Sequence, residues 1–466
     1  MRRRLIFRLA VALLLCASAS PTRADDVDKY VREQMAKRHI PGVSVAVVRD
    51  GKLVKAKGYG LANLELNVPA APDTVYEIGS LTKQFTATAV MLLVEDGKVN
   101  LDDHVAKYLE RAPEAWKNIT VRHLLTHTSG IFNYVGTPGF ELSRHLTGDQ
   151  FIKAAANLPV LFEAGSSWEY SNTNYTLLGH LVERASGKPF WQFLDERLFR
   201  PAGMNQTRYN DFGKVIPARA NGYFWRNNEW TNRNPIVADV AAAGALLSSA
   251  LDMAKWEAAL SSGKVLRPAS LEQMWTPVRL NNGKTFPYGF GWSVETFRGR
   301  RQMSHGGLMG GFSSYMTRFP DDRLTVIVLS NLANLRERPQ AGALGIGISA
   351  IYIPSLALGA LREIPDPEPQ TTRKLRDALA ALLDGKPEAS LFTPPSLEFH
   401  TSERGRALHK EIAAHGPLKS LSLLERKEEG EDRLYLYRAL VGRDKIYLSF
   451  TLTNEGKISS LRVEEE

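Results

Sequence analysis

The sequence predicts an α+β protein: an antiparallel sheet flanked by helices, an all-α lobe beside it, and a small C-terminal α+β domain. Three observations lead to this fold class. A hairpin pattern lies near the start of the chain, further strand patterns lie near residue 330, and a mainly helical stretch runs between them from about 80 to 275. Strands from both ends most economically form one sheet, which leaves the middle of the chain to a separate helical lobe.

The first residues are typical of a secretory signal. Residues 1–24 begin with arginines, continue with an apolar run and end with small residues, so we expect them to be removed on export. Their removal takes away five arginines and lowers the formal charge from +9 to +4. It also removes Cys16, the single cysteine, so the mature chain would hold no disulfide. We expect a periplasmic or secreted protein.

The sheet-forming segments follow from alternation and turn residues. A short amphipathic helix over 26–38 precedes a segment that alternates apolar and polar residues around Asp50-Gly51, a strong hairpin signal. Late strands are expected on both sides of the turn at 320–322. The mature chain has no dense block of lysine or arginine, which argues against a nucleic-acid partner.

Residues 341–361 carry no charge over 21 positions, which is long enough for a membrane span. Four glycines and Pro354 favour instead a buried helix that packs on the sheet and ends before the proline. A membrane-associated segment stays the alternative, because membranes tolerate glycine and proline in helices. The sequence indicates nothing about the oligomeric state.

The C-terminal part begins after a proline-rich linker at 363–372. We expect residues 373–466 to form a separate α+β domain. Its predicted helices cover 373–383 and about 402–415, and its predicted strands lie at about 418–425, 433–440, 445–452 and 457–464. No cluster in it points to chemistry, so its role is not indicated by the sequence.

Ser80 and Lys83 are the first candidate catalytic pair. Ser80 follows a glycine at the start of a predicted helix, and Lys83 lies about one turn later on the same face. A serine hydroxyl needs a base to take its proton, and a neutral lysine can be that base. Burial and the positive end of the helix dipole both lower the pKa of an amine. A plain helix cap at Ser80 is the alternative.

Two further motifs could complete such a site. Tyr170-Ser171-Asn172 precedes an amphipathic helix and offers a phenol, which as a tyrosinate could share the base role, and an amide. His305-Gly306-Gly307 adjoins a predicted strand, where glycines allow a ligand to approach the backbone closely. Packing residues and a turn are the respective alternatives.

Taken in order, Ser-x-x-Lys, Tyr-x-Asn and His-x-Gly resemble the three motifs of serine β-lactamase-like, or penicillin-binding-protein-like, hydrolases. The chain looks most like the branch with class C β-lactamases, family VIII carboxylesterases and D-amino-acid-specific peptidases. Stretches 121–131, 201–207 and 241–256 also look like that branch, and the resemblance covers about residues 26–350. It implies a hydrolase domain over 25–362, with the site between sheet and lobe and with no cofactor or metal.

The resemblance also assigns roles. It implies that Ser80 is the acylated nucleophile, that Lys83 and Tyr170 form the base network, and that Asn172 orients the substrate. The substrate-binding strand would hold His305, Gly306 and Gly307, and the N–H groups of Ser80 and Leu308 would form the oxyanion hole.

One position departs from the family pattern. Penicillin-recognising members usually carry lysine where this chain has His305, which is mostly neutral at pH 7. This favours an ester or amide, cleaved as by a carboxylesterase or D-amino-acid peptide hydrolase, over substrates with a free carboxylate. A true β-lactamase or DD-carboxypeptidase, and a catalytically silent binding protein on the same fold, stay as alternatives.

His123 and His127 are spaced four apart and could share one helix face as metal ligands. A zinc-protease helix would carry glutamate at position 124, where this chain has leucine. We therefore expect structural histidines.

Overall fold

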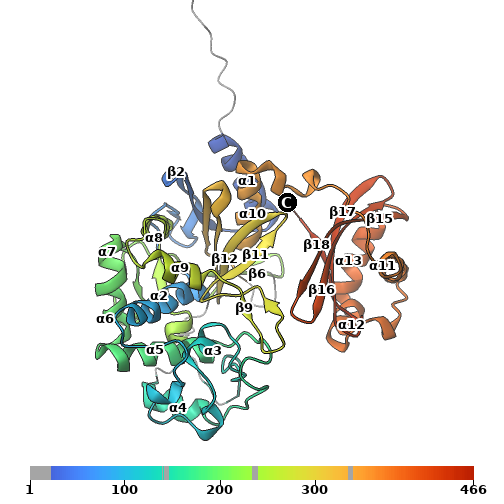
Figure 1. The fold of residues 1–466 in the computed structure, drawn as a ribbon. Helices are drawn as coiled ribbons and strands as arrows, with labels where there is room; N and C mark the ends of the chain where they lie inside the picture. The colour runs from blue at the N-terminus through green and yellow to red at the C-terminus, as the bar shows by residue number, and fades with distance from the viewer. Residues whose placement is uncertain (1–22, 139, 141–145, 234–239, 334–339, 466) are drawn as a thin grey trace, which may run out of the picture.

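A computed structural model describes residues 23–138, 140, 146–233, 240–333 and 340–465. All but the last two residues of the predicted signal segment lie outside these ranges. The larger part of the protein is a seven-stranded antiparallel sheet covered by helices, and the smaller part is a second sheet with its own helices (Figure 1).

Both ends of the larger part contribute to its sheet. The strand order is β11-β12-β13-β14-β1-β2-β3, and β1 pairs antiparallel with β14 from Val43 opposite Ser330 to Arg49 opposite Leu324. The prediction of one sheet built from both ends is confirmed. The strands are β1 (Gly42–Arg49), β2 (Lys52–Asn63), β3 (Val68–Pro69), β11 (Ser293–Phe297), β12 (Arg300–Met309), β13 (Phe312–Phe319) and β14 (Leu324–Ser330).

Strand β1 is buried on both faces of the sheet. Its side chains alternate between two apolar cores, as the pleat of a strand requires. Val45 and Val47 pack into the core that contains α1 (Arg23–Lys37) and α10 (Gln340–Tyr352), whereas Ala46 belongs to the core shared with the helical lobe. The sheet therefore lies between two helical layers.

Helix α10 is the uncharged segment that has the length of a membrane span. It packs on β13 and β14, with Ala341, Leu344 and Ile348 fully buried, and it ends two residues before Pro354. Gly347 is required by its packing, because a Cβ atom there would lie 1.9 Å from the Tyr30 hydroxyl. Within the described ranges, no helix has both the length and the apolar character needed to cross a bilayer.

The middle of the chain forms the predicted lobe. Helix α2 runs through its centre and is buried along nearly its whole length. The helices of this region are α2 (Thr82–Glu95), α3 (Val121–Leu125), α4 (Gly148–Ala155), α5 (Asn172–Ser186), α6 (Phe190–Leu194), α7 (Arg200–Ala202), α8 (Ala250–Ser261) and α9 (Pro268–Met274).

The mainly helical middle is interrupted by short strands that the sequence did not predict, within 208–233 and 240–248. Two to four residues are too few to give a clear alternation in the sequence. A small three-stranded sheet has the order β4-β8-β5, and β6 pairs with β7. These strands, with the later pair β9–β10, are β4 (Tyr76–Glu77), β5 (Arg208–Tyr209), β6 (Tyr223–Arg226), β7 (Glu229–Asn232), β8 (Leu246–Ser248), β9 (Val278–Arg279) and β10 (Thr285–Phe286).

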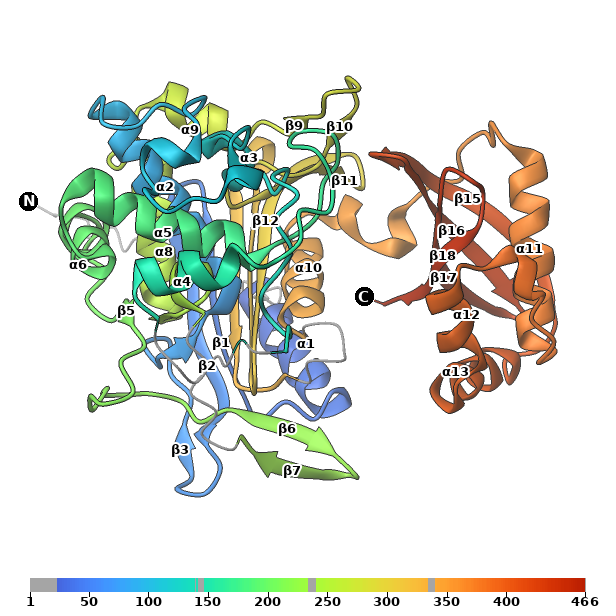
Figure 2. The same cartoon turned by 90° about the horizontal axis from the view of Figure 1, so that it is seen from below.

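The C-terminal part is an extra sheet domain with a core of its own. Its four strands pair in sequence order, and its helices lie on the face turned away from the rest of the protein (Figure 2). The strand predictions agree with the structure within a few residues. The elements are α11 (Pro369–Leu383), α12 (Pro394–Thr401), α13 (Glu403–Ala413), β15 (Leu418–Glu429), β16 (Asp432–Val441), β17 (Asp444–Leu452) and β18 (Ile458–Glu464).

Two boundaries in this part differ from the sequence prediction. Helix α11 begins at Pro369, so the last four residues of the predicted linker 363–372 are helical; proline fits the first turn, where its missing N–H is not needed. Helix α12 was not predicted, because it opens with two prolines and has little amphipathic pattern.

Candidate active site

Ser80 lies in a short 3₁₀ turn, Gly79–Leu81, that leads into α2. This turn lies directly on β12. A Cβ atom on Gly79 would lie 2.8 Å from the Leu308 nitrogen, and a Cβ atom on Gly307 would lie 2.0 Å from the Ile78 oxygen. Glycine at both positions therefore lets the nucleophile turn and the strand touch backbone to backbone, while Ser80 itself stays partly exposed.

Lys83 lies fully buried beneath Ser80. Its Nζ is 3.1 Å from Ser80 Oγ and donates to Asn172 Oδ1 and to the carbonyl oxygen of Ala243, both at 2.8 Å. Burial holds the pKa of Lys83 well below its ordinary value, and no carboxylate among the described residues forms an ion pair with it. A neutral amine has two N–H donors, which the two carbonyl oxygens accept, so its lone pair is left for the Ser80 proton.

Tyr170 approaches the nucleophile from the lobe. Its hydroxyl donates to Ser80 Oγ at 2.9 Å, and the Lys83 Nζ lies 4.8 Å from its ring centre. Burial raises the pKa of Tyr170, so the group beside Ser80 is a neutral phenol. The tyrosinate considered from the sequence is therefore corrected: low polarity around the ring disfavours the anion, and Lys83 is the better resting base.

Asn172 is the first residue of α5, and its side chain faces Lys83. Its backbone N–H and its Nδ2 both donate to Asn133 Oδ1, at 3.1 and 3.2 Å. This pair of bonds fixes the amide so that Oδ1 accepts from Lys83. Asn172 thus holds the base as well as lying where the resemblance puts a substrate ligand. Asn133 was missed by sequence reasoning, since no motif marks it.

His305 is buried on β12, and both of its ring nitrogens already have partners. Its Nδ1 donates to the Gly306 carbonyl oxygen at 2.7 Å, and its Nε2 accepts from the Tyr288 hydroxyl at 3.0 Å. Burial, with a smaller contribution from Lys83, lowers the pKa of His305 to about 4. The ring is therefore neutral at pH 7 and offers no free N–H to a substrate carboxylate. Tyr288 has no sequence signal.

Strand β12 has an open edge at the candidate site. Strand β11 pairs only as far as Ser304, so among the described strands none pairs with Gly306, Gly307 or Leu308 on that side. On the other side, Met309 and Phe312 close a two-residue turn and form a hydrogen-bonded pair. Hydrogen-bonded and non-hydrogen-bonded pairs alternate along an antiparallel ladder, so the next pair, Leu308 and Ser313, is not hydrogen-bonded. The Leu308 N–H therefore faces away from β13, toward the nucleophile turn, as an oxyanion donor must.

His127 lies under Tyr170 rather than on a helix with His123. Helix α3 ends at Leu125, and His127 adopts a left-handed φ of 59°. Its Nδ1 accepts from the Ser171 N–H at 3.2 Å, and its ring lies 4.4 Å from that of Tyr170. His123 caps α3 instead. Among the described residues, no three histidine, cysteine or acidic side chains are grouped so as to hold a metal ion.

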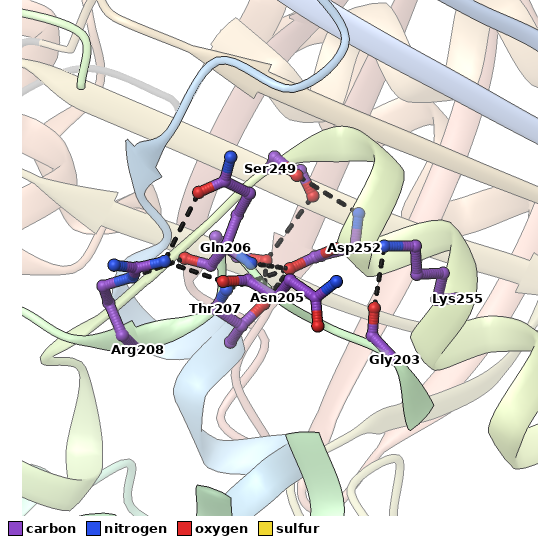
Figure 3. Close-up of polar contacts among 9 residues, drawn as sticks. Gly203, Asn205, Gln206, Thr207, Arg208, Ser249, Asp252 and Lys255 are labelled. Carbon is purple, nitrogen blue, oxygen red and sulfur yellow. Dashed lines mark hydrogen bonds and ion pairs between the residues drawn. The ribbon is translucent and has the colours of Figure 1, made fainter. Parts of the chain in front are cut away.

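A buried aspartate on α8 binds the stretch 201–207 (Figure 3). Asp252 Oδ2 accepts from the N–H groups of Gln206 and Thr207, at 2.6 and 2.9 Å, and from the Thr207 hydroxyl at 3.1 Å. Thr207 also bonds Ser248 at the end of β8, which pairs with β4 just before Ser80. The stretches 201–207 and 241–256 are thus joined into one platform, and Ala243 connects this platform to Lys83.

Comparison with known proteins settles which family has this arrangement. The β-lactamase family model matches residues 27–347, which is well over half of the chain. The chain belongs to the β-lactamase family. Members of this family are generally serine hydrolases.

Similar proteins have several reported activities within this β-lactamase fold. Penicillin-binding protein 4* of Bacillus subtilis is 32% identical over 327 residues, covering 66% of this chain and 72% of the relative. The octameric penicillin-binding protein homologue from Pyrococcus abyssi matches 95% of this chain and 98% of its own, at 24% identity and a TM-score of 0.62. D-amino acid amidase from Ochrobactrum anthropi SV3 matches 71% of this chain and 99% of its own, at 24% identity and a TM-score of 0.60.

Proposed function

We propose that this β-lactamase family protein is an exported hydrolase that forms an acyl-enzyme on Ser80 and cleaves an ester or an amide without a free carboxylate at the recognition site. The activity would be of the carboxylesterase or D-amino-acid peptide hydrolase type. One observation carries the proposal: the fully buried Lys83 amine and the Tyr170 phenol both contact Ser80 Oγ, at 3.1 and 2.9 Å.

The geometry supports a two-step mechanism. Ser80 Oγ attacks the substrate carbonyl carbon while its proton passes to the lone pair of Lys83. The oxyanion that forms is held by the N–H groups of Ser80 and Leu308. The leaving group then takes a proton from Tyr170, which regains one from the Lys83 ammonium. Water attacks the acyl-enzyme with the same groups acting in reverse.

The chemistry of His305 supports the choice of substrate. A neutral imidazole with both nitrogens occupied provides no positive charge for the carboxylate of a penicillin or of a D-Ala-D-Ala peptide. A second candidate function is that of a penicillin-recognising enzyme, and the name of the Bacillus subtilis relative favours it. Export is proposed from the signal-like residues 1–24.

Intact-protein mass spectrometry tests the proposal. The purified protein is incubated separately with an activated ester, a penicillin, a cephalosporin and a D-Ala-D-Ala peptide, and its mass is read for a covalent adduct. We expect an acyl adduct with the ester, weak or no adduct with the β-lactams, and none in Ser80→Ala. Rapid acylation by penicillin would favour the second candidate. No adduct and no turnover with any substrate would favour a silent binding protein.

A further inference from the structure

The C-terminal domain contacts a hairpin of the hydrolase domain. The turn between β15 and β16 lies against the turn between β9 and β10, on the side of the sheet facing the hydrolase domain (Figure 2). Glu431 Oε1 accepts from Lys284 Nζ at 2.8 Å and from Asn282 Nδ2 at 3.5 Å. A Cβ atom on Gly430 would lie 3.5 Å from the ring of Phe286, which is van der Waals contact.

The same β9–β10 hairpin is fastened to the helical lobe on its other side. The Asn281 N–H donates to the Gly165 carbonyl oxygen at 2.9 Å, and Asn281 Nδ2 donates to the Ala164 carbonyl oxygen at 3.0 Å. The tip of the hairpin is therefore held between the lobe and the C-terminal domain. Its position depends on both.

The base of this hairpin carries residues that touch the active site. Phe286 stacks on Trp168 with ring centres 4.0 Å apart and planes 14° apart, and Trp168 lies two residues before Tyr170. Two residues after Phe286, Tyr288 donates to His305 on β12. A shift of the hairpin would therefore move the surroundings of Tyr170 and of the substrate-binding strand together.

We propose that Glu431 is a positioning residue of the active site. Through Lys284, the C-terminal domain fixes the β9–β10 hairpin and, with it, the stacked rings of Phe286 and Trp168, the latter two residues before Tyr170 in the chain. The inference rests on the proposed function and gives the C-terminal domain a role in it. Glu431 touches neither the nucleophile nor the base, so it acts on the site through its contacts with Lys284 and Asn282.

Other contacts keep the C-terminal domain docked when the Glu431 contact is removed. Lys427 on β15 pairs with Glu295 on β11 at 3.1 Å, and both side chains are about three-quarters covered. Leu358 forms an apolar cluster with Leu424 and Leu436 of the C-terminal sheet. A substitution at Glu431 therefore tests the hairpin contact without releasing the domain.

Charge reversal and its compensation provide the test. Glu431→Lys, Lys284→Glu and the double variant are made in the full chain, with Glu411→Lys as the matched control. Glu411 is an exposed residue on α13, which lies on the far face of the C-terminal sheet (Figure 2). Kinetics with p-nitrophenyl acetate are measured, and hydrogen–deuterium exchange is followed over residues 278–288.

Lys284 and Glu431 are each about half exposed, so the effect of each single reversal is modest. We expect a two- to fivefold loss of kcat/KM, mainly in kcat. Exchange over 278–288 should be faster, the melting temperature unchanged, and both kinetic and exchange effects reversed in the double variant. Single variants that match wild type and Glu411→Lys in both rate and exchange would overturn the inference, as would a double variant without recovery.

The two proposals fail in different ways. If the wild-type chain is never acylated, the proposed function fails, while faster hydrogen exchange in Glu431→Lys would still support the positioning of the hairpin. If wild type is acylated at Ser80 and the Glu431 and Lys284 variants behave as wild type, only the positioning role fails.

Discussion

Lys83 is enclosed by Ser80, Asn172 and Ala243, and this enclosure determines its protonation state. An exposed lysine has a pKa of about 10.4 and would be charged at pH 7. Burial penalises the charged form and brings the pKa of Lys83 well below that value. The same residue would be a poor base on the surface and is a competent one in this position.

This lowered pKa predicts the pH dependence of the reaction. Activity requires neutral Lys83, so kcat/KM for an activated ester should rise with pH as the ammonium loses its proton and should then level off. Because the pKa of Lys83 lies well below its ordinary value, the rise should finish far below pH 10. A rate profile between pH 5 and 10.5 measures this. Activity that appears only near pH 10 would mean that Lys83 is charged in the resting site.

At the scale of elements, the contact between the nucleophile turn and β12 depends on Gly307. We predict that Gly307→Ala lowers kcat/KM by about 100-fold or more, since its Cβ would lie 2.0 Å from the Ile78 oxygen and would push Ser80 away from the strand. Gly342→Ala on α10 is the matched control, because its Cβ would meet only the Tyr315 ring, at 3.9 Å. Ester hydrolysis and circular dichroism of both variants are compared. Equal losses in the two variants would contradict this account.

The contacts of Asp252 in the platform of 201–207 and 241–256 lead to a prediction about stability. Asp252→Asn weakens the bonds that Oδ2 accepts from Gln206 and Thr207, and hydrogen bonds to a charged acceptor contribute about 1.5–3 kcal/mol each. We expect the free energy of unfolding to fall by about 2–3 kcal/mol, measured by urea denaturation. Asp73→Asn, at an exposed site of the same domain, should leave it unchanged. Equal stability of both variants would show that the platform contributes little.

The elements that could be predicted from the sequence are those with a long repeating pattern or distinct turn residues. The β1–β2 hairpin at Asp50-Gly51 and the burial of α10 are examples. Short strands such as β5 could not be predicted, because their pairing partner β8 is distant in the chain. In the site, Ser80, Lys83 and Tyr170 were identifiable because they stand in motifs. Asn133 and Tyr288 were not, because only the fold brings them to Asn172 and His305.

At the scale of the whole molecule, the hydrolase domain and the C-terminal domain have separate apolar cores. The C-terminal core contains residues from 375 to 461 alone, and the apolar contact between the two domains centres on Leu358, Leu424 and Leu436. The ion pairs across the interface are Lys284–Glu431, Lys427–Glu295 and the pairs of Lys37 and Arg38 with Glu465. All of them keep part of their side chains in solvent, so each contributes about 1 kcal/mol or less. The interface is thus strong enough to position the β9–β10 hairpin. It is too weak to make the two domains unfold as one unit.

We therefore predict two transitions in scanning calorimetry of the full chain, one for each core. A covalent adduct on Ser80 forms only in the folded hydrolase domain, so acylation should shift the transition of that domain and leave the other in place. Glu431→Lys should change neither midpoint, because the pair that it breaks lies at the exposed edge of the interface. A single transition whose calorimetric and van't Hoff enthalpies agree would mean that the interface couples the two cores far more strongly than its apolar cluster and its ion pairs account for.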